Sequence, residues 1–77
     1  MNPVDRYAVV FEAPSHEGGN WSGFAPDLPG LAVTGDTLEE CRENMASGIA
    51  VYLDECRRMG YPVPPPTTRT EEMQVAA

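Results

Sequence analysis

The sequence predicts an α+β domain in which a three-stranded antiparallel meander precedes one long helix and a short fourth edge strand. Three short apolar segments follow one another in the first half of the chain, separated by turns rich in glycine or proline. A single amphipathic segment then occupies residues 38–59. With 77 residues the chain has room for one domain, which we take as residues 1–77.

The first strand is expected at residues 6–12. Its side chains alternate, so that Tyr7, Val9 and Phe11 share one face while Ala8 and Val10 share the other. Both faces are therefore largely apolar. A strand of this kind is typical of the interior of a sheet, and we expect it to be central.

Two short connections join the remaining strands. Residues 15–20 contain two glycines suited to a tight turn, and they lead into a second strand at residues 21–25. The prolines of residues 26–30 form the next turn, which is followed by a third strand at residues 31–34. Such short connections favour antiparallel pairing of consecutive strands.

The helix has clear signals at both ends. Thr37 is the expected N-cap, and Glu40 three residues later completes a capping box. Gly60 is suited to the C-terminal cap, and Pro62 prevents continuation. The predicted apolar stripe consists of Leu38, Cys41, Met45, Gly48, Ile49, Tyr52, Leu53, Cys56 and Met59. A glycine at position 48 within this stripe indicates a close approach to the sheet.

The C-terminal segment is rich in proline. Residues 62–66 are expected to form an extended spacer. Residues 66–77 form either the fourth, edge strand or a flexible tail, because Met73 and Val75 alternate with more polar neighbours.

The charge balance restricts the possible partners. The chain has five arginines, no lysine and twelve acidic residues, which gives a formal net charge of −7. Such a chain repels phosphate groups and anionic lipid surfaces, so we expect neither direct nucleic-acid binding nor membrane binding. A basic protein is the partner that this charge suits best.

The two cysteines are expected to be free. Cys41 and Cys56 lie 15 positions apart on the same predicted helix, which separates them by about 22 Å and rules out a disulfide within the chain. The chain also has no apolar run long enough to span a bilayer and no signal-peptide pattern at its start. We therefore expect a cytoplasmic protein.

A single helix can cover only one face of the predicted sheet. Since both faces carry apolar side chains, one apolar row must remain uncovered, although the sequence does not decide which row that is. An uncovered apolar patch on a small domain usually marks an interface. We therefore expect the chain to work by binding another protein, itself or both, with a homodimer or higher oligomer as the expected state.

Four segments of the chain carry a family resemblance. They read Y-A-V-V-F-E from residue 7, W-S-G-F-A-P-D-L-P-G from residue 21, T-G-D-T-L-E-E from residue 34 and G-Y-P-V-P-P-P from residue 60. In this combination the chain resembles the short form of the HicB-like antitoxin family. The resemblance implies a truncated ribonuclease-H-like fold, with the last strand placed beside the first.

The resemblance also implies a function. Members of the family bind a small basic toxin and mask its mRNA-cleaving site, which requires no cofactor. Many members continue into a C-terminal DNA-binding domain, which no segment of this chain resembles. Repression of an operon through DNA binding is therefore not expected of this chain.

The residues expected to contact the partner surround the proline turn: Trp21, Phe24, Asp27, Leu28 and Pro29. Two of them have an alternative interpretation. Leu28 could equally fill the end of the sheet as part of the core, and Trp21 could cover the core rather than face a partner. No catalytic or metal-ligating residue is predicted.

Two other functions remain open. The chain could be a module of the same fold that only associates with itself. It could also be a metal-dependent nuclease, with Glu12, Asp27 and Asp36 as carboxylate ligands. The second alternative is disfavoured because Asp27 lies in a turn and Asp36 precedes a helix cap, where such residues have ordinary structural roles.

Overall fold

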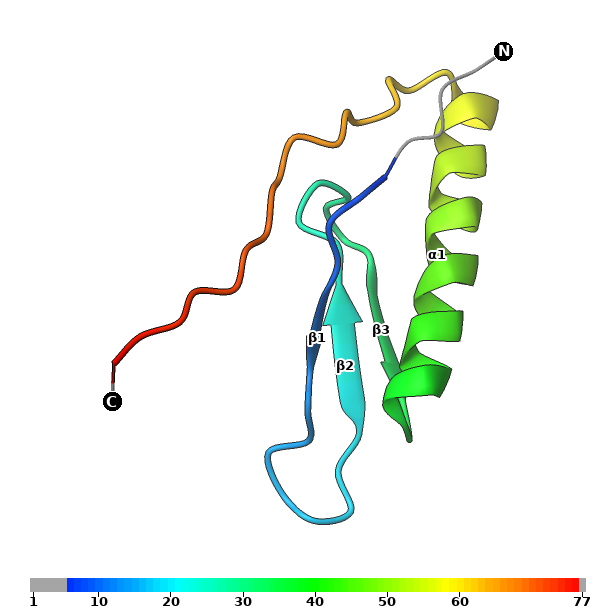
Figure 1. Cartoon of the computed structure of the whole chain (residues 1–77). Helices are drawn as coiled ribbons and strands as arrows, with labels where there is room; N and C mark the ends of the chain where they lie inside the picture. Colours follow the sequence, from blue (N-terminus) through cyan, green and yellow to red (C-terminus); the bar gives the residue numbers. More distant parts are fainter. Residues whose placement is uncertain (1–5, 77) are drawn as a thin grey trace.

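The computed structural model describes residues 6–76. Strands β1 (Val10–Glu12), β2 (Trp21–Phe24) and β3 (Ala32–Gly35) form an antiparallel sheet in the order β1-β2-β3, and helix α1 (Leu38–Met59) follows. The helix contacts β2 and β3 and lies along one side of the sheet (Figure 1). The predicted α+β architecture of a meander followed by one helix is confirmed.

The strand register decides which side chains face the helix. Three cross-strand rows align: Val10 with Phe24 and Ala32, Phe11 with Gly23 and Val33, and Glu12 with Ser22 and Thr34. An ideal Cβ built on Gly23 would lie 3.4 Å from the Cys41 sulfur of α1. The row of Phe11, Gly23 and Val33 therefore faces the helix, and the two rows beside it face away.

The position of β1 differs from the prediction. Strand β1 pairs only with β2 and forms an edge of the sheet, whereas β2 is central. The expectation of a central first strand was based on its two apolar faces. One face is covered, because Tyr7, Val9 and Phe11 pack against the core. Within residues 6–76 the outer edge of β1 has no neighbouring strand.

The core lies between the sheet and α1. Its buried members are Ala25, Leu28, Cys41, Met45 and Cys56, of which Leu28 and Cys41 are completely inaccessible. Neither cysteine forms a disulfide. The rest of the predicted helix stripe is half-buried, with the exception of Met59, which is 53% exposed. Met59 lies in the last turn of α1, beyond the part of the helix that the sheet covers.

Both helix ends have the expected caps, with one difference in detail. The Glu40 amide donates to Thr37 Oγ1 at 3.0 Å. Glu40 Oε1 accepts from the Asp36 amide at 3.3 Å. In a capping box it would accept from the amide of the N-cap residue, Thr37, which is one residue later. At the other end, Gly60 has a φ of 75° and the Tyr61 amide donates to the Cys56 carbonyl at 2.9 Å.

The segment after α1 is extended, and the predicted fourth strand is not found in residues 61–76. Tyr7 Oη donates to the Pro64 carbonyl at 2.6 Å, which holds the first part of this segment against the domain. Beyond residue 68 the chain runs away from the sheet (Figure 1). Met73 and Val75 are each 80% exposed there.

Replacing Gly35 with alanine is expected to lower the free energy of unfolding by about 2 kcal/mol or more. An ideal Cβ at Gly35 would lie 2.5 Å from the Cys41 amide nitrogen and 2.8 Å from its Cα. The start of α1 would therefore have to move away from β3. Urea denaturation followed by circular dichroism measures the change.

The matched control is Thr34→Ala, at the preceding and exposed position. This substitution should change the free energy of unfolding by less than about 0.5 kcal/mol. Equal urea midpoints for the two variants would contradict a packing role for Gly35.

Candidate protein-binding surfaces

The turn between β2 and β3 is tightly folded and buries its central leucine. The Leu28 amide donates to the Ala25 carbonyl at 3.0 Å, and the Leu31 amide donates to the Leu28 carbonyl at 3.1 Å. These two bonds direct the Leu28 side chain inward, where it is inaccessible to solvent. The structure thus supports the core interpretation of Leu28 over that of a partner anchor. Pro29 is exposed on the outside of the turn.

Asp27 of the same turn holds the C-terminal segment. Its Oδ2 accepts from the amides of Thr67 and Thr68 at 2.9 and 2.8 Å, and its Oδ1 accepts from the two hydroxyls at 3.0 and 2.7 Å. These hydrogen bonds favour the ionised carboxylate. They lower the pKa of Asp27 from its ordinary value of 3.8, with the Thr68 amide and hydroxyl as the main causes. We call this contact the Asp27 clamp.

The sheet face opposite α1 is only partly apolar. Phe24 is 41% exposed and lies between Val10 and Ala32 in the aligned strands. The next row consists of Glu12, Ser22 and Thr34, which are polar. The uncovered face is therefore smaller and less apolar than the sequence suggested, because the large side chains of residues 7, 9 and 11 pack toward the helix.

Trp21 and Phe24 do not form one surface. Trp21 is two residues from Gly23 and shares its face of β2, the face toward α1, while Phe24 faces away. Trp21 is half-buried. Of the five residues expected to contact a partner, the structure leaves Phe24 and Pro29 exposed, half-buries Trp21, buries Leu28 and engages Asp27 with the C-terminal segment.

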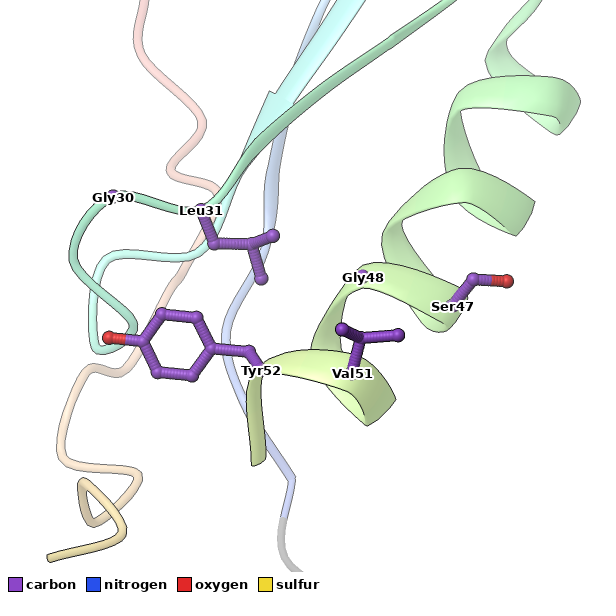
Figure 2. Close-up of a pocket in the computed structure, with 6 residues that line it drawn as sticks. All are labelled: Gly30, Leu31, Ser47, Gly48, Val51 and Tyr52. Atoms are coloured by element: carbon purple, nitrogen blue, oxygen red, sulfur yellow. The ribbon is translucent and has the colours of Figure 1, made fainter. Parts of the chain in front are cut away.

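A hollow that sequence analysis missed lies beside α1. It has a volume of about 420 Å³ and is lined by Gly30, Leu31, Ser47, Gly48, Val51 and Tyr52. Figure 2 shows Leu31 facing Gly48 across it, with the Tyr52 ring reaching toward the turn that contains Gly30. The Tyr52 hydroxyl donates to the Pro29 carbonyl at 3.0 Å, which fixes this ring against the turn.

A second hollow continues the first along the helix. It has a volume of about 460 Å³ and is lined by Val51, Tyr52, Glu55, Cys56 and Tyr61. The two hollows share Val51 and Tyr52, so they form one surface, which we call the helix groove. Val51 is 68% exposed and Tyr61 is 59% exposed. The sequence singled out Gly48 only as a point of close approach to the sheet, and Leu31 Cδ1 does lie 3.0 Å from the place where its Cβ would be.

The helix groove combines apolar and acidic character. Glu55 lines it and forms an exposed ion pair with Arg58. Asp54 and Glu43 are exposed on the same helix. Exposed ion pairs contribute little to stability, since water screens them. Over its whole length α1 carries five acidic and three basic residues, so the helix has a net negative charge.

The proposed carboxylate set does not assemble. Among residues 6–76, no group of three or more His, Cys, Asp or Glu side chains is placed to hold a metal ion. Glu12 ends β1 and Asp36 precedes α1, while Asp27 is occupied by the clamp. Nothing in this arrangement supports the nuclease alternative. In the same part of the chain, no helix is both long and apolar enough to cross a membrane.

Acid should release the Asp27 clamp. Because the pKa of Asp27 is lowered in the folded protein, the clamp is expected to be fully formed above the ordinary pKa of 3.8. It should weaken as the pH falls through the lowered value. The amide chemical shifts of Thr67 and Thr68, followed by NMR during an acid titration, report the transition.

Asp27→Asn provides the control for this titration. An amide has one acceptor oxygen in place of two, so the Thr67 and Thr68 amides should shift toward their unstructured values at every pH. Asp54→Asn, at an exposed position on α1, should leave the titration unchanged. A transition that persists in Asp27→Asn would show that another group holds the segment.

Nearly the whole chain matches a known protein family. The model of a family described as "HicB_like antitoxin of bacterial toxin-antitoxin system" matches residues 7–76, which include the three strands, α1 and the C-terminal segment. No curated protein and no solved structure was found to match. The chain therefore belongs to the HicB-like antitoxin family of bacterial toxin–antitoxin systems.

Proposed function

We propose that this chain neutralises a small basic toxin by binding it and masking its RNA-cleaving site. Membership of the antitoxin family is the observation that carries the proposal. A net charge of −7 with no lysine supports a basic partner. The mechanism is steric and electrostatic, so it needs neither catalysis nor a cofactor. We place it in the cytoplasm, where both cysteines would stay reduced.

We propose the helix groove as the docking surface. Its apolar centre, formed by Val51, Tyr52 and Tyr61, offers large side chains for a partner to cover. Glu55 places a carboxylate in the lining of the groove, where it pairs with Arg58. An apolar centre with a charged border is the usual composition of a protein interface. A basic toxin fits it because the net negative charge of the chain would steer the toxin and the apolar centre would retain it.

The residues predicted from the sequence form a second candidate surface. Phe24 and Pro29 are exposed and could contact the same toxin from the sheet side. Asp27 would take part indirectly, by holding the C-terminal segment in place. The experiment below distinguishes the two surfaces because Phe24 and Val51 can be substituted independently.

The first experiment tests whether a toxin partner exists. The tagged chain is co-expressed with any small basic protein encoded beside it, and growth, co-purification and RNA cleavage are measured. We expect restored growth, a stable complex and no RNA cleavage by the isolated chain. If no such protein co-purifies, the antitoxin proposal fails and the self-associating module is favoured. RNA cleavage by the isolated chain with Mg²⁺ would instead favour the nuclease.

Val51→Arg should weaken toxin binding by about tenfold or more, because it places a positive charge in the centre of an interface with a basic partner. Ala50→Arg is the matched control: it adds the same charge at the adjacent exposed position, which does not line the groove. It should change affinity by less than about threefold. Isothermal titration calorimetry measures both.

Phe24→Ser completes this comparison. If Phe24→Ser abolishes binding while Val51→Arg has no effect, the sheet face is the docking surface and the helix groove is not. The antitoxin function would survive that result, since it depends on complex formation and not on the surface used.

A further inference from the structure

Residues 61–68 run from the end of α1 to the turn between β2 and β3, and we call them the strap (Figure 1). Four of the eight residues are prolines, which fix φ and favour a stiff extended chain. The strap is held at two places, by the hydrogen bond from Tyr7 Oη to the Pro64 carbonyl and by the Asp27 clamp. Val63 and Pro64 are half-buried. Up to residue 68 the strap is therefore a packed part of the domain.

The first residue of the strap lines the helix groove. Tyr61 shares the second hollow with Val51 and Tyr52. Its amide donates to the Cys56 carbonyl at 2.9 Å, which fixes its backbone nitrogen at the end of α1. Its side chain is 59% exposed, and its hydroxyl makes no hydrogen bond within residues 6–76. The position of the Tyr61 ring therefore depends on the path that the backbone takes after the helix.

The turn at the other end of the strap lines the first hollow. Gly30 and Leu31 belong to this lining, and the Pro29 carbonyl accepts from the Tyr52 hydroxyl at 3.0 Å. Asp27, two residues before Pro29, joins the turn to the strap. The contacts thus form a closed ring, which runs from α1 through the strap to the turn and returns to α1 through Tyr52. Both hollows of the helix groove are lined by members of this ring.

We propose that attachment of the strap by Asp27 and Tyr7 positions Tyr61 and thereby prepares the helix groove for a protein ligand. Asp27 and Tyr7 are positioning residues, and Tyr61 is the contact through which they act. When the strap is released, the ligand has to order Tyr61 on binding, which lowers its affinity. The coupling is reciprocal, so a protein in the groove favours the attached strap. This inference rests on the helix groove being the docking surface of the proposed function.

The isolated chain tests the coupling without a partner. Asp27→Asn weakens the clamp, Tyr7→Phe removes the hydroxyl that holds Pro64, and the double variant combines both changes. The Val51 methyl resonances sense the neighbouring Tyr61 ring, and Tyr61→Ala gives their positions without it. In NMR spectra of the double variant they should shift toward these positions. Asp54→Asn, at an exposed position of α1, should leave them unchanged, and circular dichroism should show equal helix content in all variants.

A double-mutant cycle tests whether Asp27 acts through Tyr61. Calorimetry with the co-purified basic protein should show that Asp27→Asn weakens binding by about fivefold. Tyr61→Ala should weaken it by about tenfold. Adding Asp27→Asn to Tyr61→Ala should then weaken binding by less than about twofold further, because the contact through which Asp27 acts is already lost.

The clamp can also be opened from the side of the strap. Thr67→Val with Thr68→Val removes both hydroxyl donors to Asp27 and leaves the turn unchanged. It should weaken binding by about threefold. The matched control is Thr67→Ser with Thr68→Ser, which keeps both hydroxyls and should retain the affinity of the parent chain.

Two results would overturn the inference. Additive effects of Asp27→Asn and Tyr61→Ala would mean that Asp27 contacts the ligand itself or acts through another surface. Val51 resonances that do not move when the strap is released would show that the strap leaves the groove unchanged. Failure of the proposed function gives a different result: the parent chain binds no basic protein, and the Val51 resonances alone then decide whether the strap shapes the groove.

Discussion

The length of α1 relative to the sheet is the constraint on which the rest of the structure depends. A helix of 22 residues is about 33 Å long, whereas a strand of four residues spans about 13 Å. The first half of α1 covers the sheet, and its second half extends beyond it. The turn that contains Leu28 and the chain before β1 cover part of this second half. The hydrogen bond from the Tyr52 hydroxyl to the Pro29 carbonyl fixes the turn against the helix. The uncovered remainder is the helix groove.

Close contact between α1 and β3 keeps this arrangement rigid. Gly35 allows the start of α1 to approach β3, and Gly48 allows Leu31 to lie 3.0 Å from the place where a Cβ would be. Asn44 adds a hydrogen bond of 2.8 Å from its side chain to the Thr34 carbonyl. A helix held this closely to the sheet cannot tilt, so the side chains of its second half stay exposed. The same packing that stabilises the small core therefore keeps the helix groove open.

The helix could be predicted in detail because its signals are local: Thr37 caps one end and Gly60 the other. The position of β1 depends on strand order, which its two apolar faces do not determine. Gly23 decides which face of the sheet meets α1, since its missing side chain admits both Phe11 and Cys41. The first hollow of the helix groove escaped prediction because it joins Gly30 and Leu31 to residues of α1 that are distant in sequence. Alternation within one segment carries no information about such a contact.

Asp27 connects the compact part of the chain with its extended end. It lies in the turn that buries Leu28, and it holds Thr67 and Thr68 just before the chain leaves the domain. The direction of residues 69–76 is thus set by the same turn that completes the core. Neither these residues nor β1 lines the helix groove.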